Sequence, residues 1–296
     1  MANNKIFLLF FLHLFFYSHS QNKNSYDFVG GLLLNGSNEE FVSYKINFTE
    51  ENGLIKGFSI TDLGGDHETK NSLIGKYDKA KKTLTFREDA IIYTKSTLKK
   101  TAFCYVNYSG KMSLNASNPK INDIFKGLYK NDTKCIDGKI QMIGSKKIMQ
   151  LATKINNKIQ KSKKIDAKTK EKVNPLRTLD SLSLNILKES KNLQMFTKDK
   201  QISFDISDQG AEDGDMITIY VDGKIILENY TVVKKNKIID IPIVNKTTVI
   251  EVEAINEGDY APNTSNVVVK DSNNTLKTIT KLSKGKKTMI TIESEK

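Results

Sequence analysis

The sequence predicts a mainly β protein with an N-terminal small β-barrel or sandwich, a basic helical connector and a C-terminal immunoglobulin-like β-sandwich. Three observations predict this. Apolar and polar residues alternate with a period of two in many short runs, which is typical of strands with one buried face. Turn signals recur at roughly ten-residue spacing near the C-terminus. The middle of the chain combines excess positive charge with apolar residues at helical spacing.

Residues 1–20 are expected to be a secretory signal peptide. Lys5 precedes the apolar run Ile6–Phe16, which is shorter than the about 20 residues that a helix needs to cross a bilayer. Ser18 and Ser20 are small residues of the kind that a signal peptidase recognises, so cleavage is expected after Ser20, with an uncleaved anchor as the alternative. The protein is therefore expected to be exported: periplasmic, outer-membrane-associated or secreted, with no transmembrane span in the mature chain.

Residues 21–144 are expected to form the N-terminal β domain. Within "FVSYKINF", Val42, Tyr44, Ile46 and Phe48 alternate with polar residues and predict a strand with one buried face. About eight short strands with frequent glycine turns favour a small barrel or sandwich. Such a barrel could enclose a small apolar ligand, but an interior filled by its own side chains is the favoured interpretation.

The two cysteines of the chain, Cys104 and Cys135, are expected to form a disulfide. Outside the cytoplasm a lone pair of cysteines usually oxidises, and closing this loop restrains the unfolded chain by about 3–4 kcal/mol. The strands that contain them are expected to be neighbours in a sheet. Two buried thiols are the alternative, and a zinc site is not expected, because the mature chain adds only His67 as a further nitrogen ligand.

Residues 145–200 are expected to be a basic connector. The whole chain has a formal net charge of +12, and this stretch alone holds 15 basic and 5 acidic residues. One amphipathic helix is predicted by apolar residues at helical spacing, namely Ile148, Leu151, Ala152, Ile155 and Ile159. A second helix is expected after Pro175, with Thr178 or Asp180 near its N-cap. Its apolar side would consist of Leu179, Leu182, Ile186 and Leu193. Binding of an anionic surface is one hypothesis for this stretch, and a solvated lysine-rich face is the other.

Residues 201–296 are expected to form the immunoglobulin-like β-sandwich. The Asp222-Gly223 pair predicts a two-residue turn that closes a tight hairpin. In "VIEVEA", Ile250, Val252 and Ala254 alternate with glutamates, which predicts another strand with one buried face. Strand-like runs of this kind over ~100 residues are typical of a sandwich.

An acidic run opens this last region. It comprises Asp205, Asp208, Glu212, Asp213 and Asp215. Carboxylate oxygens suit calcium, although the spacing is not that of an EF-hand loop. Docking onto the basic connector, which would fix the angle between the two β domains, is a second hypothesis. A solvated loop between strands is the third.

Two segments resemble a known module. "DQGAEDGDMITIYVDGK" (208–224) and "AINEGDYAPNTSNVVVKD" (254–271) are similar to the C-terminal module of uncharacterised exported β-rich proteins of Gram-negative bacteria, over residues 201–296. Ala261 and Ser265 depart from the usual residues of that module. "GKYDKAKKTLTFRE" (75–88) and the cysteine pair resemble the front half of such proteins. The resemblance implies an exported β-rich protein and carries no activity with it.

The residue inventory argues against an enzyme. His67 is the one histidine after the signal peptide, no partner near it marks a nucleophile, and no phosphate-binding or dinucleotide fingerprint is present. We therefore expect a non-catalytic exported accessory or binding protein of the cell envelope. Its partner would be an envelope protein, a glycan or an anionic surface, not a nucleic acid, and no cofactor is expected apart from the calcium hypothesis. The alternatives are a small-ligand carrier that uses the N-terminal barrel and a carboxylate-dependent hydrolase.

Overall fold

The computed structural model describes residues 24–36, 40–162, 164–166, 169–170, 173–176, 184–208, 210 and 212–295. The expected signal peptide lies outside the described residues. So does the start of the expected second helix, including Thr178, Leu179, Asp180 and Leu182. Strands dominate the described part of the chain, which confirms the prediction of a mainly β protein.

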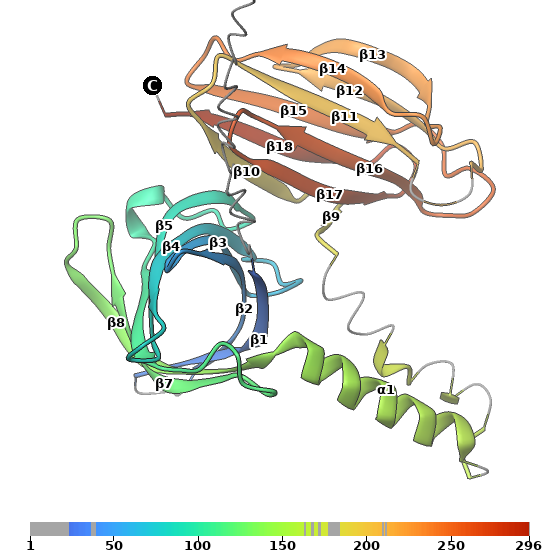
Figure 1. The fold of residues 1–296 in the computed structure, drawn as a ribbon. Coiled ribbons are helices and arrows are strands. Elements are labelled where there is room, and N and C mark those ends of the chain that lie inside the picture. Colours follow the sequence, from blue (N-terminus) through green and yellow to red (C-terminus); the bar gives the residue numbers. More distant parts are fainter. Residues whose placement is uncertain are drawn as a thin grey trace, which may run out of the picture.

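The first β unit is a closed antiparallel barrel of eight strands (Figure 1). Each strand pairs with the next, and β1 also pairs with β8, which closes the sheet. A short 3-10 helix, Lys100–Ala102, lies between β5 and β6. The strands are β1 Asn24–Leu34, β2 Glu40–Glu51, β3 Leu54–Thr61, β4 Thr69–Asp78, β5 Thr83–Thr94, β6 Tyr105–Lys111, β7 Lys120–Leu128 and β8 Lys134–Gly144. Of the two architectures expected for this region, the barrel is confirmed.

The second β unit consists of two sheets that share one core. One sheet has the order β13-β12-β15-β18-β10, and the other has the order β14-β11-β16-β17-β9. The first contains β10 Asn192–Thr197, β12 Met216–Val221, β13 Lys224–Thr231, β15 Thr247–Ala254 and β18 Lys287–Ser294. The second contains β9 Ile186–Lys188, β11 Gln201–Ser207, β14 Lys237–Pro242, β16 Asn263–Lys270 and β17 Thr275–Leu282. Buried residues from both sheets form a single hydrophobic cluster, so the sheets pack face to face.

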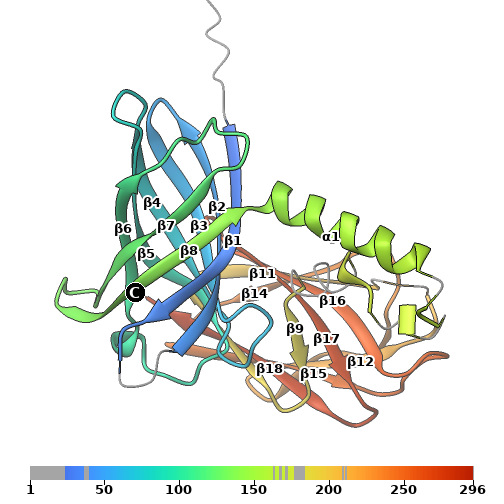
Figure 2. The same cartoon turned by 90° about the horizontal axis from the view of Figure 1, so that it is seen from below.

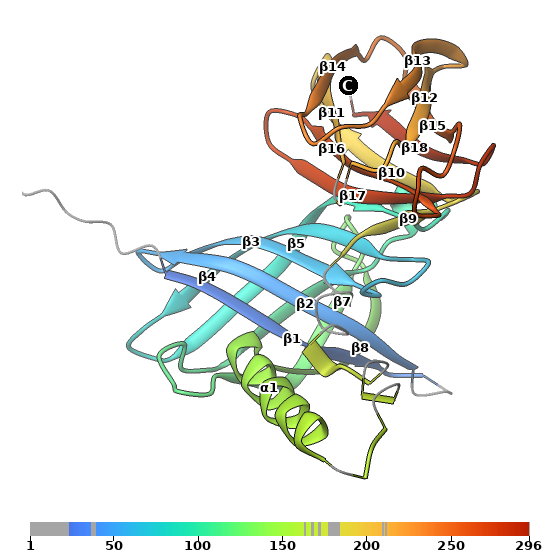
Figure 3. The same cartoon turned by 90° about the vertical axis from the view of Figure 1, so that its right-hand side faces the viewer.

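Strand β10 joins the two β units. It pairs in parallel with β18 and in antiparallel with β5, where Gln194 lies opposite Thr94 and Met195 lies opposite Tyr93. Hydrogen bonding therefore runs without a break from the barrel into one sheet of the second unit. Ile92, at the end of β5, belongs with Tyr93 to the core cluster of the second unit. Figure 3 shows the two units meeting where β5 reaches β10.

Helix α1, Ser145–Lys161, follows β8 directly and extends away from the barrel (Figures 1 and 2). It contains the first helix that the sequence predicts. Only Ala152 of its apolar stripe is buried, whereas Leu151 and Ile155 are 44% and 50% exposed. Neither this helix nor any other in the described part of the chain has the length and apolar character needed to cross a membrane.

The expected second helix is wrong in its C-terminal half. Ile186 lies in β9 and Leu193 lies in β10. The apolar spacing fits two short strands as well as a helix, and Ser190 between them has a φ of 58°, which no helix accommodates. Leu193 is fully buried in the core of the second unit, where strand pairing satisfies its backbone. These strands fall within residues 145–200, the stretch expected to be connector.

Candidate functional site

The predicted disulfide between Cys104 and Cys135 is present, with its two Cα atoms 6.1 Å apart. The expectation that it joins neighbouring strands is wrong. Cys135 lies in β8 and Cys104 immediately precedes β6, and β7 runs between these two strands in the sheet. The sulfurs occupy the space beside Gly127 of β7, because a Cβ atom there would lie 2.5 Å from one sulfur and 3.1 Å from the other. The missing side chain of Gly127 makes room for the crosslink.

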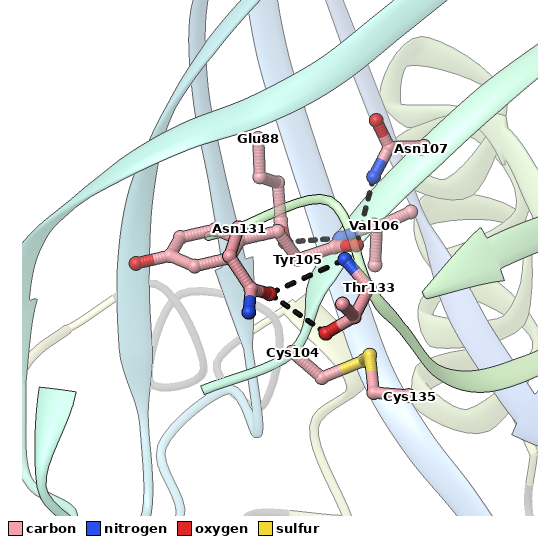
Figure 4. The surroundings of a disulfide bond; sticks show 8 residues. All are labelled: Glu88, Cys104, Tyr105, Val106, Asn107, Asn131, Thr133 and Cys135. Carbon is pink, nitrogen blue, oxygen red and sulfur yellow. Dashed lines mark hydrogen bonds between the residues drawn. A yellow bond between two sulfur atoms is a disulfide. The ribbon is translucent and has the colours of Figure 1, made fainter. Parts of the chain in front are cut away.

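Hydrogen bonds hold the chain near both cysteines, in the loop before Cys135 and in the strand after Cys104 (Figure 4). In the loop between β7 and β8, Asn131 Oδ1 accepts hydrogen bonds from the N–H of Thr133 at 3.2 Å and from its hydroxyl at 2.7 Å. On the β6 side, the N–H of Val106 donates to Glu88 Oε2 at 2.7 Å. The crosslink therefore secures the turn end of the β7–β8 hairpin, next to a buried carboxyl group.

The interior of the barrel is filled by its own side chains. Inward residues of all eight strands and of the loop after β6 form one hydrophobic cluster. Aromatic rings contact one another across it: Phe28 and Phe48 have ring centroids 6.0 Å apart, and Phe86 and Tyr108 have theirs 5.2 Å apart. A small-ligand carrier would need this space for its ligand, so the interior gives that alternative no support.

Three glutamates of the barrel unit, Glu50, Glu68 and Glu88, are buried. Glu50 accepts a hydrogen bond from the Gly53 N–H at 2.8 Å. Glu88 and Glu68 have more partners, and both are closed off from solvent. Glu88 is 4% exposed and accepts hydrogen bonds from Tyr44 Oη at 3.0 Å, Ser59 Oγ and the Val106 N–H. Burial raises the pKa of Glu88, and these hydrogen bonds oppose the shift. Since all its neighbours come from the barrel itself, Glu88 is a structural carboxyl rather than one offered to a substrate.

Glu68 is likewise a buried carboxyl group that is hydrogen-bonded by the protein's own groups. It is 3% exposed and accepts hydrogen bonds from Tyr93 Oη at 2.8 Å and from the Gly64 N–H at 2.6 Å. The ammonium of Lys95 lies 3.6 Å from its carboxylate. The neighbouring His67 is exposed, and its backbone N–H donates to Asp62. Among the described residues, no hydrogen bond joins its imidazole to a nucleophile.

An open groove crosses the outer wall of the barrel and has a volume of about 860 Å³, within the range of ligand sites. Its lining comes from β3, β4, β5, β6 and β7. Most lining residues alternate along their strands with the core residues Ile55, Phe86 and Tyr108 and therefore point outward. Leu54 and Ile124 are 54% and 65% exposed, which makes the groove unusually apolar for an outer wall.

Basic side chains surround these apolar residues. The groove is lined by Lys56, Lys76, Arg87 and Lys126, and no carboxylate is among its lining residues. The nearest acidic partner of Arg87 is Asp89, at 3.6 Å. The groove therefore combines an apolar floor with a positive rim.

Local strand geometry explains why the groove lies there. The pairing of β6 with β7 covers only three residue pairs and ends at Asn107 opposite Lys126. Beyond that point β6 continues beside β5, while β7 continues beside β8. The groove is lined by residues on both sides of this divergence, including Ser109 of β6 and Ile124 of β7.

Four carboxylates of the acidic run have separate partners, and Asp213 is held through its backbone. Asp205 binds Lys270 and accepts a hydrogen bond from Ser203 Oγ at 2.7 Å. Asp208 Oδ1 accepts from the Gly210 N–H at 2.6 Å, and Glu212 Oε1 accepts from the Lys234 N–H at 2.6 Å. The backbone carbonyl of Asp213 accepts from the Asp259 N–H at 2.9 Å. The run is therefore held mainly by local contacts within the second unit.

Asp215 holds together the two segments that carry the resemblance to a known module. Its Oδ2 atom accepts a hydrogen bond from the Thr264 N–H at 2.7 Å. Asn263 then donates to the carbonyl oxygens of Met216 and Asn256, both at 3.0 Å. The "EDGD" and "PNT" residues thus meet at one corner of the second unit, and the side chain of Asp215 is buried there.

Burial is the main cause that raises the pKa of Asp215 to about 6. The negative charges of Asp213, Asp208 and Glu257 raise it further, against the hydrogen bond from Thr264. The pKa of Asp205 shifts the other way. Burial is the largest single cause and raises it, but the hydrogen bonds from Lys270 and Ser203 and the positive charge of Lys270 together outweigh burial, and the net pKa lies below its ordinary value. The acidic run therefore contains two buried carboxyl groups whose pKa values shift in opposite directions.

The calcium and docking hypotheses gain no support from these contacts. Within the described ranges, no three His, Cys, Asp or Glu side chains lie where they could hold a metal ion together. None of the ion pairs between described residues joins the acidic run to α1. Asp205 lies in β11 and, like Asp208 and Asp215, is buried, so a solvated loop does not describe these three residues either.

Comparisons with known proteins supply no relative. No protein-family model matches the chain, and neither the curated proteins nor the solved structures yield a match.

Proposed function

We propose that the protein is a non-catalytic exported binding protein of the cell envelope and that the outer-wall groove of the barrel is its binding surface. The observation that carries this proposal is the combination of exposed apolar residues with four basic side chains on a rigid closed barrel. Exposed apolar patches with a polar rim mark interaction sites. The buried, self-satisfied carboxyls Glu88 and Glu68 favour a binding role over hydrolysis.

The occupant that fits this groove best is an acidic segment of another envelope protein that also carries apolar side chains. A positive rim attracts and orients negative charge, while Leu54, Ile74 and Ile124 provide apolar contacts. Sugar recognition usually relies on exposed aromatic faces. The groove's aromatic residues, Phe86 and Tyr108, are 1% and 3% exposed, so a glycan is the poorer fit.

Several finer features belong to the same proposal. Residues 1–20 act as a cleaved signal peptide, and α1 belongs to a helical connector between the units. The second unit is an immunoglobulin-like sandwich, as its shared core and its resemblance to an exported module suggest. No cofactor is required for binding in the groove.

Capture with groove variants tests the function. The mature protein is immobilised and exposed to its own envelope fraction, alongside the double variant Lys56→Glu/Lys126→Glu and the variant Ile124→Ser. Matched controls are Lys224→Glu/Lys237→Glu and Ile238→Ser, which change exposed residues of the second unit. A protein retained by wild type and controls is identified and purified. Its affinity for wild type, for the controls and for each groove variant is then measured by calorimetry.

The expected result is a purified partner that binds wild type and controls equally and binds each groove variant at least tenfold more weakly. Its affinity for wild type should fall as salt rises, because the rim charges are screened. Equal binding by groove and control variants would overturn the groove as the binding surface. Turnover of any captured component by the wild-type protein would overturn the non-catalytic assignment.

A further inference from the structure

A second cavity lies between the two β units, away from the outer-wall groove. It has a volume of about 530 Å³, within the range of small-molecule sites. The barrel contributes Lys45 from β2, Phe58 from β3 and Lys70 from β4. The second unit contributes Asn185, just before β9, and Lys277 from β17. Pockets at the junction of two units are common ligand sites, because both surfaces take part in recognition.

Three ammonium groups face this cavity, and no carboxylate is among its lining residues. Lys45 has a distant partner, since its Nζ lies 3.8 Å from Asp27. Within the described part of the chain, neither Lys70 nor Lys277 has a carboxylate oxygen within 4 Å. The side chains that line the cavity therefore carry a net positive charge, which Asp27 and Glu68 offset only from outside the lining.

Lys70 is held in place there. Its Nζ lies 4.1 Å from the centroid of the Phe58 ring, a cation–π contact that fixes the ammonium. Burial lowers the pKa of Lys70, the buried Glu68 raises it, and the charges of Lys277 and Lys45 lower it again. The three lysines thus repel one another in a partly desolvated space. An anion placed among them would attract all three ammonium groups and offset that repulsion.

A residue that lines the cavity, Asn185, has an unpaired side-chain amide buried in the cavity wall. The side-chain amide of Asn185 is buried, and neither its Nδ2 nor its Oδ1 atom has a hydrogen-bond partner. Its backbone carbonyl is occupied, accepting from Thr278 Oγ1 at 3.0 Å and from the Ile279 N–H at 2.9 Å. Buried polar groups in native proteins are normally paired, so a ligand that accepts a hydrogen bond would complete this site.

We propose that the cavity between the barrel and the second unit binds a small tetrahedral oxyanion, a phosphate or sulfate group, through Lys45, Lys70, Lys277 and the amide of Asn185. Such groups present several acceptor oxygens and two negative charges, which match three ammonium donors and one amide donor. The apolar lining from Phe58 and Ile279 accommodates an organic substituent on the anion. This site does not depend on the outer-wall groove, and it places one ligand in contact with both units.

Calorimetric titration of the full mature chain tests the site. The probes are inorganic phosphate and inorganic sulfate, each compared with chloride at equal ionic strength. The variants are Lys70→Gln and Lys277→Gln, with Lys224→Gln as a control on the far side of the second unit. Because Lys277 is exposed, its substitution leaves the core intact, so one variant reports on binding even if the other folds poorly.

The expected result is saturable binding of at least one oxyanion to wild type and to the control. Each cavity variant should bind at least tenfold more weakly. The bound anion should also raise the melting temperature of wild type but not of Lys277→Gln. The two probes separate a phosphate ligand from a sulfate ligand. No saturable binding at millimolar concentration, or equal binding by Lys277→Gln and wild type, would overturn the proposal.

Discussion

The two β units fill their cores by different means. Among the described residues, seven of the 18 members of the barrel cluster are aromatic, but only two of the 22 members of the second cluster are. One of those two, Tyr93, comes from a barrel strand. A closed barrel leaves a central space that rings fill, whereas two facing sheets interdigitate branched aliphatic side chains. The barrel also has the disulfide, and the second unit has none.

The difference indicates that the barrel is the more constrained of the two units. The barrel has no free sheet edge, because its first and last strands pair, and the crosslink secures the turn end of the β7–β8 hairpin. The second unit relies on paired sheets and on corner contacts such as the one between Asp215 and Thr264. A groove on the barrel therefore rests on the more constrained support.

The largest loss of stability is expected when an aromatic ring in the barrel core is truncated. Phe86→Ala should cost about 3–5 kcal/mol of unfolding free energy, because the ring is almost fully buried and leaves a cavity in a closed barrel. A smaller truncation in the second unit, Ile219→Val, removes one methyl group and should cost about 0.5–1.5 kcal/mol. Urea unfolding followed by circular dichroism measures both. Equal losses would contradict the view that the ring of Phe86 fills space on which the barrel depends.

Removal of the disulfide should have the next largest effect. The variant Cys104→Ser/Cys135→Ser should lose about 3–4 kcal/mol, because the loop across a separation of 31 residues is no longer closed in the unfolded chain. Reductant should destabilise the wild type to a similar extent and leave the variant unchanged. If reductant shifted both proteins equally, the crosslink would not be the source of the barrel's extra stability.

A smaller effect is expected at the glycine beneath the crosslink. Gly127→Ala should cost about 1–3 kcal/mol, because the new methyl group would overlap a disulfide sulfur and the Ile136 carbonyl. Gly210→Ala is the control, since its nearest neighbour would be 3.8 Å away. Thermal melts of both variants measure the difference. A neutral Gly127→Ala would show that the disulfide does not need this space.

The smallest expected effect concerns pH in the second unit. The pKa of Asp215 is about 6 in the folded protein and about 3.9 in an unfolded chain. The folded state therefore holds this proton more tightly, and the contribution of Asp215 to stability falls as pH rises from about 4 to about 6. Asp215→Asn should remove that fall, leaving melting temperatures at pH 4 and pH 7 about 2–4 °C closer than in wild type.

Asp205 provides the opposite control. Its folded pKa lies below the ordinary value, so its contribution is present at neutral pH and is lost as pH falls through the folded pKa. Asp205→Asn should destabilise the protein at pH 7 and have little effect in strong acid. Melting curves of the two variants across pH 3–8 separate them. Parallel curves would mean that the two carboxyls do not differ as their surroundings indicate.

The sequence predicts the regular elements better than their junctions. Alternation around Tyr44, Ile46 and Phe48 identifies a barrel strand because one face is buried. The spacing of Ile186 and Leu193 fits a 3.6-residue period and predicts a helix, but these residues lie in β9 and β10. Their pairing partners in β17 and β18 lie about 90 residues away along the chain, so local pattern could not reveal them.

The candidate sites were harder to predict. The groove depends on Ile74 and Arg87, which are opposite each other on adjacent strands, and on Ile124, which lies far along the chain. Exposed isoleucines at outward positions of otherwise polar strands were the available signal. Lys70 and Lys277 come together only through the packing of the two units, and no sequence spacing encodes that contact. The cysteine pair was predictable because two thiols allow one pairing.

Strand β10 gives the molecule a second link besides the covalent chain. A protease that cuts the segment between α1 and β9 would produce two polypeptides, yet each fragment would keep its place through the pairing of Tyr93 with Met195 and the burial of Ile92. The nicked protein would travel as one particle in gel filtration and separate only in denaturant. A single cut there would therefore leave the arrangement that both candidate sites require.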